Sequence, residues 1–155
     1  MDKALRDKGL ANRKAVLGED YVNKSMAAAD GFNGPFQEIL NEYCWGLIWS
    51  DERLPKKTRS MLNLVMLACL GRMQEWELHL KGALSNGVTK DEIQAILHQI
   101  AIYAGVPLAV ECFRAARQWC ASPQAAMASA TARPRAATMS CDLAAVRTLA
   151  RRASR

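Results

Sequence analysis

Hydrophobic and polar residues recur along most of the chain with the period of an α-helix. Residues 71–84 (GRMQEWELHLKGAL) show this clearly, because their apolar side chains fall on one stripe at about 100° per residue. The stripe consists of Met73, Trp76, Leu80, Ala83 and Leu84. Arg72, Glu75 and His79 follow one border of it, at i, i+3 and i+7. This border is either a row of solvent-exposed ion pairs or a functional site, and the spacing alone leaves both open.

The same period predicts the rest of the fold. Helices are expected over residues 2–17, 19–29, 36–49, 56–70, 90–104 and 107–119. Thr89 and Glu92 have the spacing of a capping box, and Asn86-Gly87 is typical of a helix end. No segment alternates in the manner of a strand. The sequence therefore predicts an all-α fold of six to seven helices, with the most apolar helix, 56–70, buried at the centre.

A second polar group lies on an apolar helix face within residues 36–49. Glu42, Trp45 and Trp49 fall there at i, i+3 and i+7, so a carboxylate and two indoles share one side. The tryptophans are either pocket walls or core and subunit-contact residues, and Glu42 is either part of a site or an interface carboxylate. Arg59, near the start of the next helix, is either a ligand-binding group or half of a helix-end salt bridge.

Composition and charge indicate one domain followed by a basic tail. The chain has 155 residues and a net charge of +6. Residues 119–155 hold six arginines and a single acid, which gives +5, so residues 1–118 carry only +1. We expect a folded domain over 1–118 and a poorly ordered tail, rich in alanine, serine and arginine, over 119–155. A nearly neutral domain makes a nucleic-acid-binding fold a poor interpretation.

Membrane and metal-binding classes fit the sequence poorly. The longest apolar run, residues 64–70, is far shorter than the roughly 20 residues that span a bilayer, and the charged N-terminal stretch lacks a secretory signal. The five cysteines are widely spaced without a CxxC pair, and His98 lies on the polar side of its helix, far from His79. We expect a cytoplasmic protein with reduced thiols, no bound metal and no catalytic role for His98.

Five stretches of the chain resemble the carboxymuconolactone decarboxylase family. They are VLGEDYV (16–22), EYCWGLIW (42–49), LPKKTRSMLNLVMLACLGR (54–72), ELHLKGALSNGVTKDEI (77–93) and YAGVP (103–107). The resemblance runs from about residue 10 to residue 118. It implies a helical fold that forms homo-oligomers, as trimers or hexamers, and a cofactor-free reaction. That reaction is the loss of CO2 from 4-carboxymuconolactone to give 3-oxoadipate enol-lactone, in the β-ketoadipate pathway of protocatechuate breakdown.

The resemblance extends to the polar border of residues 71–84. Alkyl hydroperoxidase D-type peroxidases, a wider group of relatives, carry a CxxCxxxH helix whose histidine matches His79. Their two cysteines fall on Arg72 and Glu75, and their glutamate falls near Ser60. Because all three of those groups are replaced here, thiol peroxidase chemistry is excluded.

Decarboxylation of a small dianionic lactone requires a cation, a hydrogen-bond donor and a proton donor. We expect His79 to be the general acid, because histidine alone has an unperturbed pKa near neutrality. Glu75 would orient and charge its imidazole. Arg72 would bind a carboxylate or the lactone oxygen.

The remaining candidates would shape the substrate pocket. Arg59 is a second possible carboxylate ligand, since a guanidinium binds such groups in a bidentate manner. Trp45 and Trp49 would supply an apolar wall, with Glu42 as a carboxylate that either supports the residues touching the substrate or relays a proton. Two other functions stay open: action on another small lactone or keto acid, and a non-catalytic oligomer whose basic tail docks on nucleic acid or an acidic partner.

Overall fold

The computed structural model describes residues 2–121, and within that range the chain is all-α and contains no strand. The predicted fold class is therefore confirmed. Residues 122–155, most of the predicted tail, lie outside the described range. Within residues 2–121, every helix is too short or too polar to cross a membrane. The elements are α1 (Lys3–Leu17), α2 (Glu19–Ala27), α3 (Gly34–Ile39), η1 (Leu40–Ile48), α4 (Lys56–Cys69), α5 (Met73–Ser85), α6 (Lys90–Tyr103) and α7 (Val106–Cys120).

The helix ends that local sequence predicted are present. Thr89 Oγ1 accepts from the backbone N–H of Glu92 over 3.1 Å, and Glu92 Oε2 accepts from that of Thr89 over 2.8 Å. This capping box starts α6 as predicted. Gly87 follows α5 with a φ of 84°, a conformation that glycine adopts without strain.

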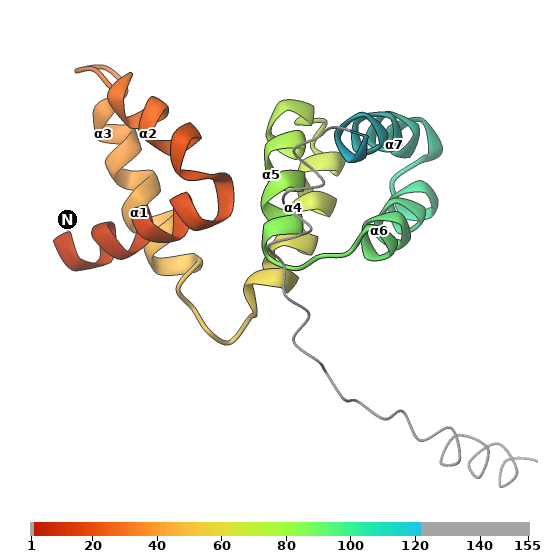
Figure 1. Cartoon of the computed structure of the whole chain (residues 1–155), viewed down its shortest axis with the longest axis horizontal. Coiled ribbons are helices and arrows are strands. Elements are labelled where there is room, and N and C mark those ends of the chain that lie inside the picture. Colours follow the sequence, from red (N-terminus) through yellow and green to blue (C-terminus); the bar gives the residue numbers. More distant parts are fainter. Residues whose placement is uncertain (1, 122–155) are drawn as a thin grey trace, which may run out of the picture.

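Two groups of helices are joined by residues 49–55, as Figure 1 shows: α1, α2, α3 and η1 form one, and α4 to α7 the other. The main hydrophobic core lies within α4 to α7 and includes Leu64, Trp76, Leu80, Leu97 and Ile100. Trp76 is fully buried, and its indole Nε1 donates to the carbonyl of Leu64 over 3.0 Å. The apolar stripe predicted on α5 therefore packs against α4.

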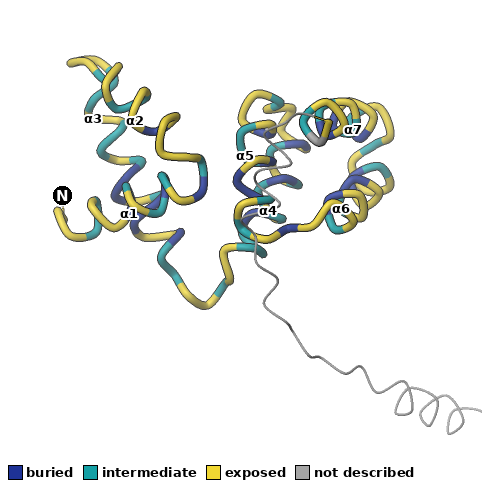
Figure 2. Tube along the Cα trace, viewed as in Figure 1, coloured by how far each residue is buried: buried dark blue, intermediate teal, exposed yellow. Residues whose placement is uncertain are grey.

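Helix α4 departs from the prediction that it is buried all round. Only Ser60, Leu64 and Ala68 are fully buried along it. Leu62 and Met66 on its other side are 46% and 52% exposed, and the exposed positions along α4 are visible in Figure 2. The prediction was wrong for this face, because α5, α6 and α7 all pack against α4 and leave one side of it open.

Glycines allow α1 to approach two other helices closely. A Cβ placed on Gly9 would lie 1.7 Å from the carbonyl oxygen of Asn41, and one on Gly46 would lie 2.5 Å from that of Leu5. At the far end of α1, a Cβ on Gly82 of α5 would lie 2.8 Å from the Val16 carbonyl oxygen. Backbone therefore packs on backbone where α1 crosses η1 and α5, which fixes η1 relative to α5.

A buried arginine ties the first group together. Arg13 is only 5% exposed, and its Nη1 donates to Gln37 Oε1 over 2.8 Å and to Asn41 Oδ1 over 3.1 Å. Its Nη2 lies 3.4 Å from Ser25 Oγ. The side chains that accept these hydrogen bonds are neutral, and burial lowers the pKa of the Arg13 guanidinium below its usual value. Arg13 thus links α1, α2, α3 and η1 through hydrogen bonds rather than an ion pair.

The helix predicted over residues 36–49 changes its winding part of the way along. It is α-helical over Gly34–Ile39 and π-helical over Leu40–Ile48. The amide of Trp49 donates to the carbonyl of Cys44 over 3.1 Å, a bond between residues five apart. Because a π-turn holds more residues than the 3.6 of an α-turn, residues four apart share one face. Asn41, Trp45 and Trp49 are accordingly all buried.

Because α1 and η1 cross so closely, we expect a single methyl group added at Gly9 to destabilise the fold unusually strongly. Gly9→Ala is expected to lower the free energy of unfolding by about 1–3 kcal/mol or more, because backbone atoms of Asn41 and Gly46 cannot turn aside as a side chain would. Gly34→Ala is the matched control, since a Cβ there meets nothing within 4 Å. Urea unfolding of both variants measures the difference. Equal stability of the two would contradict the crossing.

Candidate functional site

Three aromatic rings form a continuous stack between η1 and α5. The rings of Trp45 and Trp49 lie 4.8 Å apart between centroids, at an interplanar angle of 22°. The imidazole of His79 lies 6.2 Å from the Trp45 ring and is nearly parallel to it, at 4°. Both distances are within the range of favourable aromatic contacts. The structure thus brings together three of the predicted site residues from segments far apart in sequence.

Burial and the charge of Glu75 have opposite effects on the pKa of His79. Its side chain is half-buried on α5, and burial lowers its pKa below the usual 6.5, while the carboxylate of Glu75 one turn earlier opposes this. Glu75 itself is exposed. The net effect is a lowered pKa, so the imidazole is predominantly neutral at pH 7 in the free protein.

The two predicted arginines are not in described contact with His79. Arg72 is exposed and provides the N-cap position of α5. Arg59 donates from Nη2 to the carbonyl of Asp51 over 2.6 Å and from Nε to the carbonyl of Leu54 over 3.1 Å. Arg59 therefore fastens the loop before α4, as in the helix-end interpretation, and its Nη1 carries no hydrogen bond within residues 2–121.

Glu42 is buried, but its described partner is at the start of the chain. Its side chain is 4% exposed, and Oε1 accepts from the backbone N–H of Asp2 over 2.9 Å, beside the N-terminus of α1. The positive end of that helix favours a carboxylate there. The other oxygen, Oε2, is buried without a hydrogen bond among the described residues. Glu42 shares η1 with the tryptophans and makes no described contact with His79.

A cavity of about 370 Å³ lies against Trp49, between α1 and the loop that leads to α4. Its lining includes Lys8, Asn12, Ser50 and Lys56, which sequence reasoning did not select. Nothing in their local sequence marks them, because they lie in separate elements and meet only in the folded chain. A 370 Å³ cavity is large enough for a small ligand.

Asn12 connects this cavity to the aromatic stack. Its Nδ2 donates to the backbone carbonyl of Trp45 over 3.1 Å and to Ser50 Oγ over 2.9 Å. Its Oδ1 accepts from Lys56 Nζ over 2.8 Å. One side chain of α1 therefore holds the carbonyl of a stacked tryptophan and the ammonium of a cavity lysine.

The second histidine and the described cysteines lie apart from the stack or have low reactivity. His98 is exposed on α6, with its ring 5.7 Å from that of Phe113. Cys44, Cys69 and Cys112 are free thiols, and burial raises the pKa of Cys112 to about 11. Within residues 2–121, no three histidine, cysteine, aspartate or glutamate side chains are grouped as metal ligands. The arrangement offers a neutral imidazole at an apolar wall, suited to proton transfer.

Comparison with known proteins shows the family to which the chain belongs. The profile of the carboxymuconolactone decarboxylase family matches residues 34–118. A 4-carboxymuconolactone decarboxylase of Acinetobacter baylyi is 40% identical over 106 residues, which is 68% of this chain and 79% of that protein. The nitrosuccinic acid decarboxylase npaB of Metarhizium robertsii is 39% identical over 112 residues, which is 72% of this chain and 78% of that protein. The chain belongs to the carboxymuconolactone decarboxylase family.

Proposed function

We propose that the chain is a cofactor-free decarboxylase that converts 4-carboxymuconolactone to 3-oxoadipate enol-lactone in the β-ketoadipate pathway. Membership of the family and the two relatives named above make a carboxy-lyase the general activity. The particular substrate is supported by the relative with 40% identity, whose name states that reaction. The structural observation that carries the proposal is His79, half-buried on α5 and stacked on Trp45.

The chemistry of the substrate defines what the site must do. One carboxylate sits on the oxygen-bearing ring carbon of the lactone, and the other sits on an acetate arm. When CO2 leaves the ring carbon, its electron pair moves through the ring C=C toward the lactone carbonyl. The resulting dienolate is then protonated at the carbon next to that carbonyl. The site must therefore stabilise charge on one oxygen and deliver one proton.

His79 suits the proton-donating role once the substrate is bound. In the free protein burial lowers its pKa. A dianion beside the imidazole favours the charged form, so binding raises that pKa and charges His79 with the proton it will deliver. Glu75 acts in the same direction from one helical turn away. Substrate binding and loading of the acid are thereby coupled.

The surrounding residues take supporting roles in this proposal. The buried rings of Trp45 and Trp49 exclude water on one side of the imidazole, which strengthens the electrostatic interactions beside it. Arg72, exposed at the start of α5, holds a substrate carboxylate. Arg59 is the second cation: Nε and Nη2 hold the loop, while Nη1, which carries no hydrogen bond within residues 2–121, faces the substrate. Glu42 acts through η1, where its anchor at the start of α1 positions Trp45.

A second candidate substrate is nitrosuccinic acid, because the relative with 39% identity is named as a decarboxylase of that acid. The two molecules share a chemical skeleton. In each, the departing carboxylate is on a carbon that also carries a CH2-carboxylate arm and an electron-accepting group. The acceptor is a conjugated lactone in one and a nitro group in the other. A site that binds a substituted succinate and protonates a delocalised carbanion serves both.

We also propose that the chain works as a homo-oligomer, a trimer or a hexamer. Large apolar side chains are exposed on several parts of the single chain. They include Tyr43, Leu47 and Ile48 on η1, Leu62 and Met66 on α4, and Ile102, Tyr103 and Val110 near the α6–α7 turn. So much exposed apolar surface is typical of protein interfaces rather than of a monomer.

The proposed activity predicts turnover of 4-carboxymuconolactone without an added cofactor, and a large effect of one substitution. His79→Ala is expected to lower kcat by about 10²-fold or more, because that is the scale of a positioned acid. Loss of the lactone chromophore measures the rate, and circular dichroism confirms that the variant is folded.

The matched control is His98→Ala, which removes the other histidine from an exposed position and should leave kcat unchanged. Nitrosuccinic acid is assayed in parallel, and a higher kcat/KM for it would reassign the substrate. If the folded wild-type protein converts neither acid, the proposed reaction is wrong. If His79→Ala retains full turnover, the acid is another group.

The burial of His79 predicts a particular dependence on pH. Because its folded pKa lies below the unfolded value of about 6.5, the unfolded chain takes up the proton first as the pH falls. Stability linked to His79 is therefore present above about pH 6.5 and is lost as the pH falls through the folded pKa. Proton NMR measures that pKa directly, since the chain has two histidines and His98→Gln assigns the signals. A pKa above 6.5 in the free protein would contradict the burial argument.

The exposed apolar faces predict a mass larger than that of one chain. Light scattering coupled to gel filtration should give a defined multiple of the 17.1 kDa protomer. The measurement is repeated at tenfold dilution, because a specific assembly keeps its mass while non-specific association does not. A monomer at both concentrations would refute the assembly and leave the activity proposal standing.

A further inference from the structure

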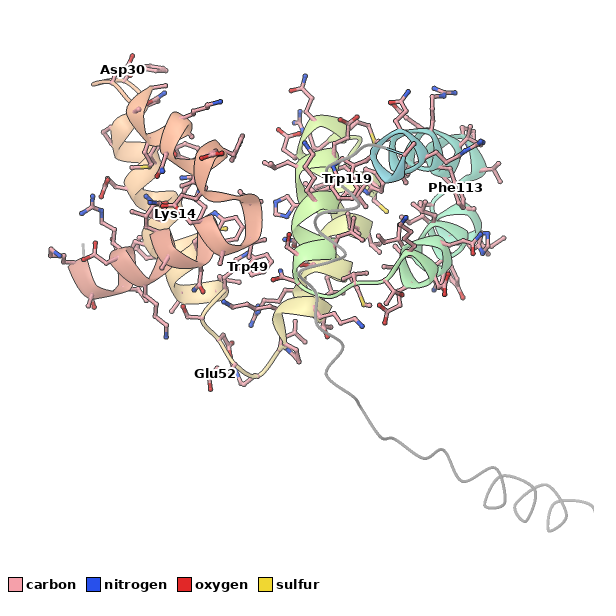
Figure 3. All side chains as sticks on the ribbon, in the orientation of Figure 1. Lys14, Asp30, Trp49, Glu52, Phe113 and Trp119 are labelled. Carbon is pink, nitrogen blue, oxygen red and sulfur yellow. The ribbon has the colours of Figure 1, made fainter. Side chains whose placement is uncertain are left out.

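The cavity beside Trp49 is separate from the His79 border of α5. Trp49 is the ring of the stack that touches the cavity, Trp45 lies against Trp49, and His79 lies against Trp45. Neither His79 nor Glu75 lines the cavity. In Figure 3, Trp49 lies on the side of η1 that faces α5, and Glu52 lies on the loop that leads to α4. The cavity is lined by residues of α1, of that loop and of the start of α4.

Two cations at this cavity have no carboxylate partner among residues 2–121. Lys8 comes from α1 and Lys56 from the first turn of α4. Lys56 Nζ donates to the neutral amide oxygen of Asn12, and no ion pair is formed by either lysine in that range. Two ammonium groups from distant segments therefore line one cavity, and neither forms an ion pair with a described residue.

Two acids also line the cavity, and they cancel only part of this charge. Asp51 is occupied by the side chain of Arg53, with bonds of 2.7 to 3.1 Å, and lies 3.9 Å from Arg59. Those hydrogen bonds lower the pKa of Asp51 to about 2. Glu52 is the other acid in the lining. Because Asp51 is paired with Arg53, Lys8 and Lys56 face Glu52 as the one lining acid without an ion pair in residues 2–121, and the net charge at the cavity is positive.

The start of α4 adds to the positive potential. Its N-cap is Pro55, which lines the cavity and provides no side-chain cap, and the first turn of α4 holds no acid. The unpaired N–H groups of a helix start attract anions. Trp49 and Leu54 supply apolar lining on the same cavity. A ligand that satisfies both features has carboxylates and a short carbon chain.

We propose that this cavity is a binding site for a small organic dicarboxylate, with Lys8 and Lys56 as the carboxylate ligands and Trp49 against the carbon chain. It is a second site, and it goes beyond the decarboxylation proposed for His79. Occupancy is transmitted to the stack, because Asn12 holds both Lys56 and the carbonyl of Trp45. A dicarboxylate drawing Lys56 away from Asn12 alters the support of the ring on which His79 stacks.

Binding is tested on the full chain with succinate as the probe, at constant ionic strength, by tryptophan fluorescence and calorimetry. Succinate should bind, and Trp49→Phe should reduce the fluorescence change without removing the heat of binding. The double variant Lys8→Met, Lys56→Met should raise Kd about tenfold or more, since each charge-assisted contact contributes substantially to binding. The control Lys81→Met removes an exposed lysine of α5 outside the cavity lining and should leave Kd unchanged.

Two further arms separate this site from the one proposed for catalysis. Arg72→Met, which removes the carboxylate ligand proposed for the catalytic site and lies outside the cavity lining, should bind succinate with a Kd within about twofold of wild type, and sodium phosphate should compete weakly because it lacks the carbon chain. Absence of binding, equal affinity of the double lysine variant, loss of binding in Arg72→Met, or equal affinity for phosphate would each overturn the proposal. Turnover by the wild-type protein is measured separately, so failure here does not affect the decarboxylase proposal.

Discussion

The backbone contact between α1 and η1 is the constraint on which the rest of the structure depends. Gly9 and Gly46 allow the two helices to approach until a single Cβ would overlap backbone atoms of the partner. The atoms that a Cβ on Gly9 would meet belong to Asn41 and Gly46, five residues apart, which is the span of one π-turn. Helix crossing and π-winding therefore occur at the same place, and together they align Trp45 and Trp49.

That alignment reaches α5 through a second close approach. Because Gly82 has no side chain, the backbone of Val16 packs directly against it. This contact holds the end of α1 against the helix that carries His79. The imidazole and the indoles thus meet because α1 packs tightly on both of their helices. Polar contacts complete the arrangement, since Arg13 and Asn12 bond to side-chain and main-chain oxygens of η1. The three stacked rings are positioned by a helix that supplies no ring of its own.

Local sequence signals were sufficient for the helices and insufficient for their winding and contacts. The Thr89–Glu92 capping box and the glycine after α5 act over a few residues, so the sequence predicted those ends correctly. The π-helix was missed because an α-helix also places Trp45 and Trp49 on one face, and the contact with Gly9 that accompanies the π-turn is distant in sequence. The position of Glu42 relative to His79 likewise depends on the tertiary structure. Within residues 2–121, Glu42 accepts its hydrogen bond from the backbone N–H of Asp2.

In the candidate site, too, some features could be predicted from the sequence and others required the fold. His79 was identified from its position on the apolar border and from the resemblance, whereas its stacking on Trp45 required the fold. Lys8 and Lys56 were not selected because a lysine in a charged helix start is ordinarily solvated, and only the cavity distinguishes these two. Arg59 had two interpretations, and its bonds to the carbonyls of Asp51 and Leu54 give the structural one a clear physical basis.

The lowered pKa of His79 bears on how the proposed reaction ends as well as how it begins. A dianionic substrate stabilises the imidazolium. When CO2 leaves as a neutral molecule, its electron pair stays on the dienolate, so the negative charge beside His79 moves from the carboxylate to the lactone carbonyl oxygen and is not lost. Proton transfer from His79 to the ring carbon then removes one negative charge and returns the imidazole to the neutral form that burial favours. The same burial leaves His79 neutral beside a product of lower charge, which weakens the attraction between them and favours product release.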